Sequence, residues 1–338
     1  MTDRTTSLTG CLLGQALGDA LGFVVEAEPP SVASEYVKGL RGGQAGRQSH
    51  PKYPFGQYSD DTQLARELLL SFVEAGGWRP DAFAGRLAAL FAQDRDVGAG
   101  PGTRAAAVRL SGGAHWSEAG TPAPYAGNGS AMRAAPLGLL YGDDTRSMVA
   151  TAIEQSSITH RDPRCSAGAL VVAGATRLAA RGTPVRSDDF LETLADLAAP
   201  ADGSVAKAVR GLQRWVHLPC AAAARWLRGE RMDPADTGAW GGISAFVTPS
   251  VVWSLYAFLR SPDDYWTTVC TAIEVGGDTD TMAAIAGAIA GGRLGPSTLP
   301  AALTERLTDR GEWGREDLVD LARRAARLVE GGPRVIVG

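Results

Sequence analysis

Two acidic clusters, far apart in the chain, contain the residues best suited to chemistry. The first is residues 59–62, Ser-Asp-Asp-Thr, and the second is residues 276–281, Gly-Gly-Asp-Thr-Asp-Thr. Each combines paired carboxylates with hydroxyl groups and leads into an Ala- and Leu-rich stretch that is typical of a helix. Adjacent carboxylates repel each other unless a cation lies between them, and Asp, Ser and Thr oxygens suit a hard divalent ion such as Mg²⁺ or Mn²⁺. We therefore predict that the two clusters meet and hold a pair of such ions.

Helix capping is the simpler alternative for each cluster. A serine followed by two aspartates can satisfy the free N–H groups of a first helical turn and complement its dipole, and Asp278 could do the same. However, Asp278 and Asp280 are only two residues apart, which is closer than capping requires. Gly276 and Gly277 add a loop that tolerates unusual backbone angles beside a site. The presence of two such clusters favours metal binding.

Two glycine-rich segments could bind an anion. Residues 125–133, Tyr-Ala-Gly-Asn-Gly-Ser-Ala-Met-Arg, place Gly-Asn-Gly ahead of a helix expected over 130–141. The free N–H groups at the start of that helix would face a ligand, although a plain turn with a cap is the alternative. Residues 98–102, Gly-Ala-Gly-Pro-Gly, also precede a helical stretch and could hold a phosphate.

Two single residues stand out by their surroundings. His160 lies in the polar segment Ser-Ser-Ile-Thr-His-Arg-Asp-Pro, where it is either structural or in contact with a ligand. Glu26 follows the apolar residues 23–25 at the end of a buried helix, which would raise its pKa into the range useful for acid–base work. A solvent-exposed glutamate at a helix end is the alternative.

The composition excludes several classes of protein. The 338 residues are 45% hydrophobic and 21% charged, as in ordinary globular proteins, and the net charge of −4 gives no basic surface for nucleic acid. The N-terminus has no apolar signal region, and the small-apolar run over 282–292 is too short to span a bilayer, so we expect a cytoplasmic protein. The cysteines are far apart and are expected to be buried, reduced thiols: Cys11, Cys165, Cys220 and Cys270.

Helical periodicity predicts an all-α fold that positions these residues. Over residues 8–25, Gly10, Gly14, Gly18 and Gly22 share one helix face, so we expect a buried groove where a neighbouring backbone packs closely. Residues 247–259 have a strand-like composition, but a proline suited to a first helical turn favours a helix. Further helices are expected over 62–75, 79–92, 103–110, 130–141, 144–156, 164–181, 187–198, 204–216, 220–227, 263–274, 281–291 and 315–329, with loops over 41–55, 96–102, 119–129 and 228–245. If residues 59–61 and 278–281 build one site, the first and last thirds of the chain must pack together, which predicts a single domain over residues 1–338.

The chain resembles the ADP-ribosylglycohydrolases, a family that includes ADP-ribosylarginine hydrolases and the dinitrogenase reductase-activating glycohydrolase. The resemblance runs from about residue 8 to about residue 325. It rests on the following segments, which occur in this order: GCLLGQALGDALGFVVE, YSDDTQLA, GNGSAMRAAPLG, SSITHRDPRC and VGGDTDTMAAIAGAIAGG. It implies a compact all-α domain with a binuclear Mg²⁺ or Mn²⁺ site in a central cleft.

The resemblance also implies roles for individual residues. The expected metal ligands are Ser59, Asp60, Asp61, Asp278, Asp280 and Thr281. Asp19 is expected to be structural or to support them from behind. The expected ADP-ribose contacts are Gly98, Gly100, Tyr125, Gly127, Asn128, Gly129, Ser130, Met132 and His160. The expected catalytic residues are Glu26, Asp61 and Asp280, with Glu26 either handling the proton or gating the cleft.

The reaction that the resemblance implies is hydrolysis of the glycosidic bond at C1″ of the distal ribose in an ADP-ribose conjugate. The favoured substrate is a protein with mono-ADP-ribose on arginine. Serine-linked or poly-ADP-ribose, small ADP-ribose esters and ADP-ribosylated nucleic acid are alternatives, and the acidic net charge disfavours the last. A non-catalytic ADP-ribose-binding or crystallin-like protein is the alternative of another class, and the complete set of carboxylates argues against it.

Overall fold

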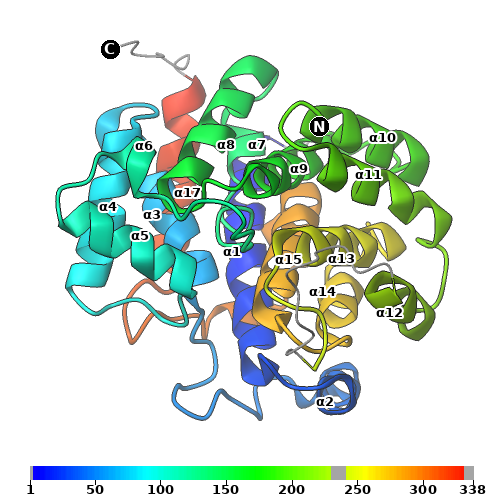
Figure 1. Cartoon of the computed structure of the whole chain (residues 1–338). Coiled ribbons are helices and arrows are strands. Elements are labelled where there is room, and N and C mark those ends of the chain that lie inside the picture. The colour runs from blue at the N-terminus through cyan, green and yellow to red at the C-terminus, as the bar shows by residue number, and fades with distance from the viewer. Residues whose placement is uncertain (1–2, 230–240, 331–338) are drawn as a thin grey trace.

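The computed structural model describes residues 3–229 and 241–330, which fold into helices joined by loops (Figure 1). Within these ranges the β contacts are isolated bridges, so the all-α prediction is confirmed. The helices are α1 (Arg4–Gly22), α2 (Pro30–Gly39), α3 (Asp60–Ala75), α4 (Pro80–Ala92), α5 (Pro101–Ser111), α6 (Trp116–Ala119), α7 (Leu137–Leu140), α8 (Thr145–Thr159), α9 (Pro163–Ala179), α10 (Ser187–Ala198), α11 (Gly203–Gly211), α12 (Cys220–Gly229), α13 (Val247–Arg260), α14 (Tyr265–Ile273), α15 (Thr279–Leu294), α16 (Ala301–Thr304) and α17 (Arg315–Glu330). Short tighter or wider turns are η1 (Phe23–Val25), η2 (Leu40–Gln44), η3 (Leu212–Arg214) and η4 (Pro296–Thr298).

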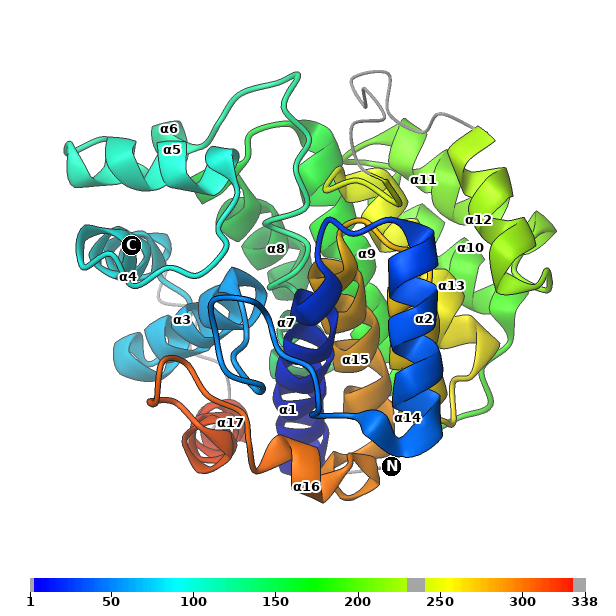
Figure 2. The ribbon, with the colours of Figure 1, turned by 90° about the horizontal axis from the view of Figure 1, so that it is seen from below.

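The helices α1 and α15 form the central pair of the molecule and lie side by side in both ribbon views (Figures 1 and 2). The glycine stripe of α1 faces α15, as the sequence predicts. A Cβ atom added to Gly18 would lie 2.1 Å from the carbonyl oxygen of Ala283, and one added to Gly14 would lie 2.4 Å from that of Gly287. Any side chain on this stripe would therefore push the two helices apart.

Other helices surround this pair and bury it. Helices α3 and α17 pack against α1, while α9, α13 and α14 pack against α15. The segment Arg4–Val25 has the length and composition of a membrane span, but 94% of its most apolar window is buried inside the protein, as expected for a core helix. The first and last thirds of the chain thus meet at the centre of the fold.

Several predicted elements differ from the structure. The helix predicted over 130–141 is wrong, because the chain makes turns up to Pro136 and only α7 is helical there. Proline lacks the N–H group for a helical hydrogen bond and disfavours helix at the residue before it. Helices α2, α6 and α16 and the wide turn η2 lie outside the predicted helices. Residues 230–240 of the predicted 228–245 loop lie outside the described residues.

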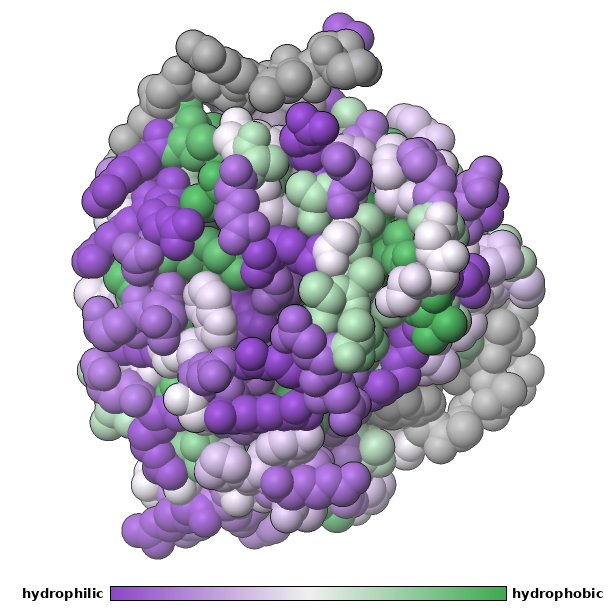
Figure 3. Space-filling view, turned by 90° about the vertical axis from the view of Figure 1, so that its left-hand side faces the viewer, coloured by the Kyte–Doolittle hydropathy of each residue, from purple (hydrophilic) through white to green (hydrophobic). Residues whose placement is uncertain are grey.

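The surface and the cysteines are those expected of an ordinary globular protein. The face that contains α4 and α5 is mostly hydrophilic, with small apolar areas between polar side chains (Figure 3). The four cysteines, all within the described residues, form no disulfide; Cys220 is half-buried and the others are buried.

Candidate metal centre

The two acidic clusters meet at the ends of α1, α3 and α15. Asp60 and Asp61 open α3, and Asp280 lies in the first turn of α15. Carboxylate oxygens of Asp19, Asp61 and Asp280 lie within 4.8 Å of one another, and so do those of Glu26, Asp278 and Asp280. Asp280 belongs to both groups, so the carboxylates form one continuous cluster. This spacing allows cations to be held between residues more than 200 positions apart in the chain.

Asp19 organises the first cluster from inside the protein. Its side chain is buried within α1 and accepts hydrogen bonds from the backbone N–H of Ser59 (2.8 Å) and of Thr62 (3.0 Å) and from the Thr62 hydroxyl (2.6 Å). These bonds fix the turn in which α3 begins. Asp19 therefore has a structural role at the start of α3, which is one of the two roles expected for it.

Asp61 shows most directly that the cluster fits a cation. Its Oδ2 atom accepts hydrogen bonds from the hydroxyls of Ser59 (2.9 Å) and Thr281 (3.3 Å). Its Oδ1 atom is fully buried and has no hydrogen-bond partner among the described residues. A buried carboxylate oxygen without a donor is strongly unfavourable, and a divalent cation would satisfy it. The capping interpretation is also correct in part, because the Ser59 hydroxyl accepts from the Asp61 N–H (3.3 Å).

The second cluster is tied to the Gly-Asn-Gly segment. The Asn128 side chain donates hydrogen bonds to Oδ2 of Asp278 and to the Ser250 hydroxyl (3.0 Å). Asp278 stands immediately before α15, yet its side chain makes no capping hydrogen bond. Its carboxylate is therefore directed to the site rather than to the helix end.

A ladder of backbone hydrogen bonds holds the loops of the site together. The N–H of Ala27 donates to the carbonyl of Gly277 (2.8 Å), and the N–H of Asp278 donates to that of Ile243 (2.8 Å). Asn128 in turn donates to the carbonyl of Ala245 (3.0 Å). These bonds join the Glu26 segment directly to the second acidic cluster. They join that cluster to the Gly-Asn-Gly segment through residues 243–245, whose place in the site no sequence motif indicates.

Burial and mutual repulsion make the carboxyl groups weak acids in the protein alone. Burial raises the pKa values of Asp60, Asp61 and Asp278 well above the usual range, and neighbouring Asp280 adds to each shift. Repulsion by Asp280, followed by burial, raises the pKa of Glu26 to about 10. A cation between these groups would favour their charged forms and lower the pKa values.

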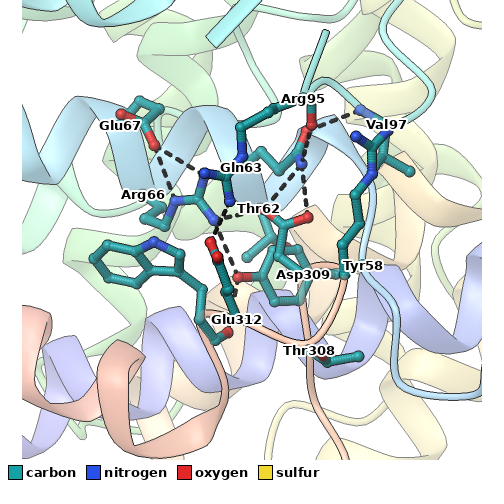
Figure 4. Close-up of polar contacts among 12 residues, drawn as sticks. Tyr58, Thr62, Gln63, Arg66, Glu67, Arg95, Val97, Thr308, Asp309 and Glu312 are labelled. Atoms are coloured by element: carbon teal, nitrogen blue, oxygen red, sulfur yellow. Dashed lines mark hydrogen bonds and ion pairs between the residues drawn. The ribbon is translucent and has the colours of Figure 1, made fainter. Parts of the chain in front are cut away.

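A buried ionic network anchors the start of α3 (Figure 4). Arg66 forms an ion pair with Asp309 (2.7 Å), and the amide of Gln63 donates to the same carboxylate (2.9 Å). The Gln63 side-chain oxygen accepts from the N–H of Val97 (2.9 Å), and the Val97 carbonyl accepts from the N–H of Asp60 (2.7 Å). The loop after α16 therefore fixes both the first acidic cluster and the loop over 94–98.

The predicted ADP-ribose contacts gather around an aromatic pair. The rings of Tyr125 and His160 stack with their centroids 5.9 Å apart, and the Tyr125 hydroxyl accepts from the N–H of Gly102 (3.3 Å). Cβ atoms added to Gly127 and Gly129 would lie 3.1 Å and 2.9 Å from the His160 ring. His160 is buried rather than set in a polar loop as the sequence suggested, and this burial lowers its pKa to about 3. It is therefore neutral at physiological pH.

The other residues predicted to contact the ligand lie in two environments, one exposed and one buried. Gly98 is exposed, and an added Cβ atom there would lie 3.5 Å from Asp60 Oδ1, whereas one on Gly100 would enter open space. Ser130 and Met132 are buried, and the Ser130 hydroxyl donates to the carbonyl of Cys165 (3.2 Å). The roles of these residues in ligand binding stay predictions.

The structure also adds residues that the sequence patterns did not single out. The Gln15 amide donates to the carbonyls of Asp61 (2.9 Å) and Met132 (3.1 Å), which links the first cluster to the Gly-Asn-Gly segment. Arg133 is fully buried and donates to the carbonyl of Gly129 (2.8 Å), which holds that segment in its turn in place of the helix we expected. The position of Gln15 on the glycine-striped helix was the only sequence signal for its role.

Comparisons with known proteins show which family the whole chain is similar to. The family model described as ADP-ribosylglycohydrolase matches residues 1–334. The chain is 28% identical to the ADP-ribosylhydrolase ARH3 of Homo sapiens over 324 residues, which cover 86% of each protein. It is 26% identical to the ADP-ribosylarginine hydrolase Tri1 of Pseudomonas putida (strain GB-1), covering 96% of this chain and 78% of that protein. A solved structure described as an ADP-ribosylglycohydrolase-related protein complex superposes with a TM-score of 0.72 and 26% identity, covering 97% of this chain and 99% of that chain.

Proposed function

The chain belongs to the ADP-ribosylglycohydrolase family, and we propose that it is a metal-dependent hydrolase that cleaves the glycosidic bond at C1″ of ADP-ribose conjugates. The observation that carries this proposal is the buried cluster of carboxylates, in which Asp61 Oδ1 has no hydrogen-bond donor within the described part of the chain. Such a cluster is unstable as a set of bare charges and is suited to divalent cations.

The residues of the chain divide into those that would hold ions and those that would meet the substrate. Carboxylates of both clusters, together with the hydroxyls of Ser59 and Thr281, would hold Mg²⁺ or Mn²⁺. Bound ions would supply Lewis-acid stabilisation of the sugar oxygens and a water of lowered pKa. Buried carboxylates beside C1″ would stabilise the positive charge that develops as the bond breaks.

Glu26 is the carboxyl group best placed to exchange a proton with the leaving group or the attacking water. It is half-buried, whereas the aspartates of the cluster are buried. Its elevated pKa keeps a proton on the carboxyl at neutral pH, and charge neutralisation at Asp278 and Asp280 would bring that pKa down toward the working range. The backbone bond from Ala27 to Gly277 holds this segment against the second cluster.

Arginine is the favoured acceptor residue of the conjugate. One relative is described as an ADP-ribosylarginine hydrolase, and another, from Rhodospirillum rubrum, is described as an ADP-ribosyl-[dinitrogen reductase] glycohydrolase. The relative described as ADP-ribosylhydrolase ARH3 has no acceptor residue in its name, so other ADP-ribose conjugates are the alternative substrate class.

Hydrolysis of ADP-ribosyl-arginine by purified protein in Mg²⁺ or Mn²⁺ and in a chelator tests this proposal. We expect activity with the metal, and loss of activity in the chelator and in Asp280→Ala. Asp263→Ala is the matched control, because Asp263 is 74% exposed and pairs only with Arg293 among the described residues. Activity that survives both the chelator and Asp280→Ala would contradict the metal-dependent mechanism.

A further inference from the structure

An aromatic cluster of Phe23, His50 and Tyr53 lies beside the metal centre and has no part in the function described so far. The rings of Phe23 and His50 are stacked almost parallel, with centroids 4.2 Å apart and an interplanar angle of 4°. The Tyr53 ring lies 5.8 Å from that of Phe23 and 5.4 Å from that of His50. All three rings are thus in mutual contact.

The cluster adjoins the carboxylates through the residues on either side of Phe23. A Cβ atom added to Gly22 would lie 2.6 Å from the Cα atom of Asp280. Three residues beyond Phe23, the carboxylate of Glu26 reaches within 4.8 Å of those of Asp278 and Asp280. A Cβ atom added to Gly98 would lie 3.5 Å from Asp60 Oδ1 and 3.8 Å from Phe23 Cε2, so this one point touches both the first acidic cluster and the aromatic cluster.

The packing of the cluster is unlike that of core aromatics. Phe23 is only 3% exposed, yet it lies outside the continuous hydrophobic core that includes its neighbours Leu21 and Val25. Within residues 47–54, His50 and Tyr53 are half-buried and all the others are exposed. A turn in which the Tyr53 N–H donates to the His50 carbonyl (3.1 Å) brings both rings to the same place. Two rings from an otherwise exposed loop therefore cover Phe23.

The chemistry of the cluster fits a planar cation. Guanidinium groups stack on aromatic faces and are attracted by the electrons of the ring. The backbone N–H of Lys52 donates to Nδ1 of His50 (3.2 Å), which leaves the proton of the neutral ring on Nε2. Partial burial, with a contribution from Lys52, lowers the His50 pKa, which favours the neutral ring and so reduces its repulsion of a cation.

We propose that His50 and Tyr53, packed on Phe23, form the subsite for the acceptor side chain and favour the guanidinium of ADP-ribosyl-arginine. This inference rests on the proposed function, because it is the distal ribose at the metal centre that places the acceptor beside Glu26 and Phe23. The adenine of the same substrate is separated from C1″ by a diphosphate and a second ribose, so it lies elsewhere. A serine acceptor offers no cation for these rings and would gain little from them.

Kinetics of His50→Ala and Tyr53→Ala with two substrates test the subsite. For ADP-ribosyl-arginine we expect KM to rise about 3- to 30-fold, the range for loss of one cation–π contact. For ADP-ribosyl-serine KM should stay unchanged, as should the Kd for free ADP-ribose in Mg²⁺. His50→Phe should keep KM for ADP-ribosyl-arginine close to the wild-type value, because it retains an aromatic ring. His115→Ala is the matched control, since His115 contacts Trp116 in a different part of the chain.

The outcomes separate this inference from the proposed function. Equal losses with both conjugates, no loss with either, or weaker binding of free ADP-ribose would overturn the acceptor subsite. Wild-type protein that hydrolyses only ADP-ribosyl-serine would also overturn it and would leave the metal-dependent hydrolase standing. Wild-type protein inactive on both conjugates with Mg²⁺ or Mn²⁺ would remove the proposed function itself.

Discussion

Gly18→Ala is expected to weaken both the fold and the metal centre, because Gly18 packs against the backbone of α15 and is the chain neighbour of Asp19. The new Cβ atom would lie 2.1 Å from the Ala283 carbonyl oxygen and 2.7 Å from its carbon, well inside the 3.0 Å that real contacts respect. Both obstructing atoms are backbone, so no side chain can turn away. To raise the 2.1 Å contact to 3.0 Å the helices must separate by about 0.9 Å, and Asp280 must move with α15.

The size of the effect follows from two opposing terms. Overpacking of a tight interface lowers the free energy of unfolding by about 1–3 kcal/mol, whereas alanine in place of glycine within a helix raises it by about 0.5–1 kcal/mol. We expect a net loss of about 1–2 kcal/mol in the free energy of unfolding, measured by urea denaturation with the chelator present. Titration of Mn²⁺ should show weaker binding by the same variant.

Two matched variants separate packing from its effect on the site. Gly10→Ala creates an equal clash, 2.1 Å from the Gly291 carbonyl oxygen, about 12 Å farther along α1, so it should lower stability but leave Mn²⁺ affinity intact. Gly85→Ala lies on the exposed face of α4, where an added Cβ atom meets nothing within 4 Å, and it should raise stability by about 0.5–1 kcal/mol. If Gly18→Ala were as stable as Gly85→Ala, the close packing of α1 on α15 would be wrong.

Three further changes have definite expected outcomes. Asp309→Asn should lower the free energy of unfolding by about 2 kcal/mol in urea denaturation, because it removes one of the two buried carboxylates that pair with Arg66 and leaves only Glu67 (2.9 Å); a loss below about 0.5 kcal/mol would show that the network in Figure 4 is not needed. The pKa of His160 is about 3 in the folded protein, below its value in the unfolded chain, so its contribution to the free energy of unfolding is lost as pH falls from about 6.5 toward 3. Between pH 7.5 and 5 the free energy of unfolding should fall by about 2 kcal/mol more in the wild type than in His160→Gln, and equal decreases would contradict the burial of His160. Gly277→Ala should weaken Mn²⁺ binding measurably in a calorimetric titration, since Gly277 has a φ of +86° and an added Cβ atom would lie 2.1 Å from the Ile243 carbonyl oxygen; unchanged affinity would show that the ladder does not position the second cluster.

The sequence predicts the parts of this fold that have a strong local period. The spacing of Gly10, Gly14, Gly18 and Gly22 indicates a close helix contact, and the structure supplies α15 as the partner. The expected helix over 130–141 fails because local composition competes with Pro136 and with the Arg133 side chain, which donates to a carbonyl in its own turn. Such a side-chain bond depends on burial that a periodic pattern does not show.

The site was predictable in its residue types but not in its connections. Paired carboxylates with hydroxyls indicated that the two clusters meet, and the structure brings Asp61 and Asp280 together. The bond between Asn128 and Asp278, the support from Asp309 and the stacking of His50 on Phe23 join segments with no shared motif. Those contacts arise from tertiary packing of irregular loops, for which the sequence offers no period to follow.

Mn²⁺ binding followed by electron paramagnetic resonance tests the central claim most directly. We predict that the wild type binds two Mn²⁺ ions per chain, that Mg²⁺ displaces them, and that Asp61→Asn and Asp280→Asn each abolish or sharply weaken binding. Because both residues would belong to one site, the double variant should lose little more than either single variant. Full Mn²⁺ binding by Asp61→Asn or Asp280→Asn, or no binding by the wild type, would contradict a shared divalent-cation centre built from the two clusters.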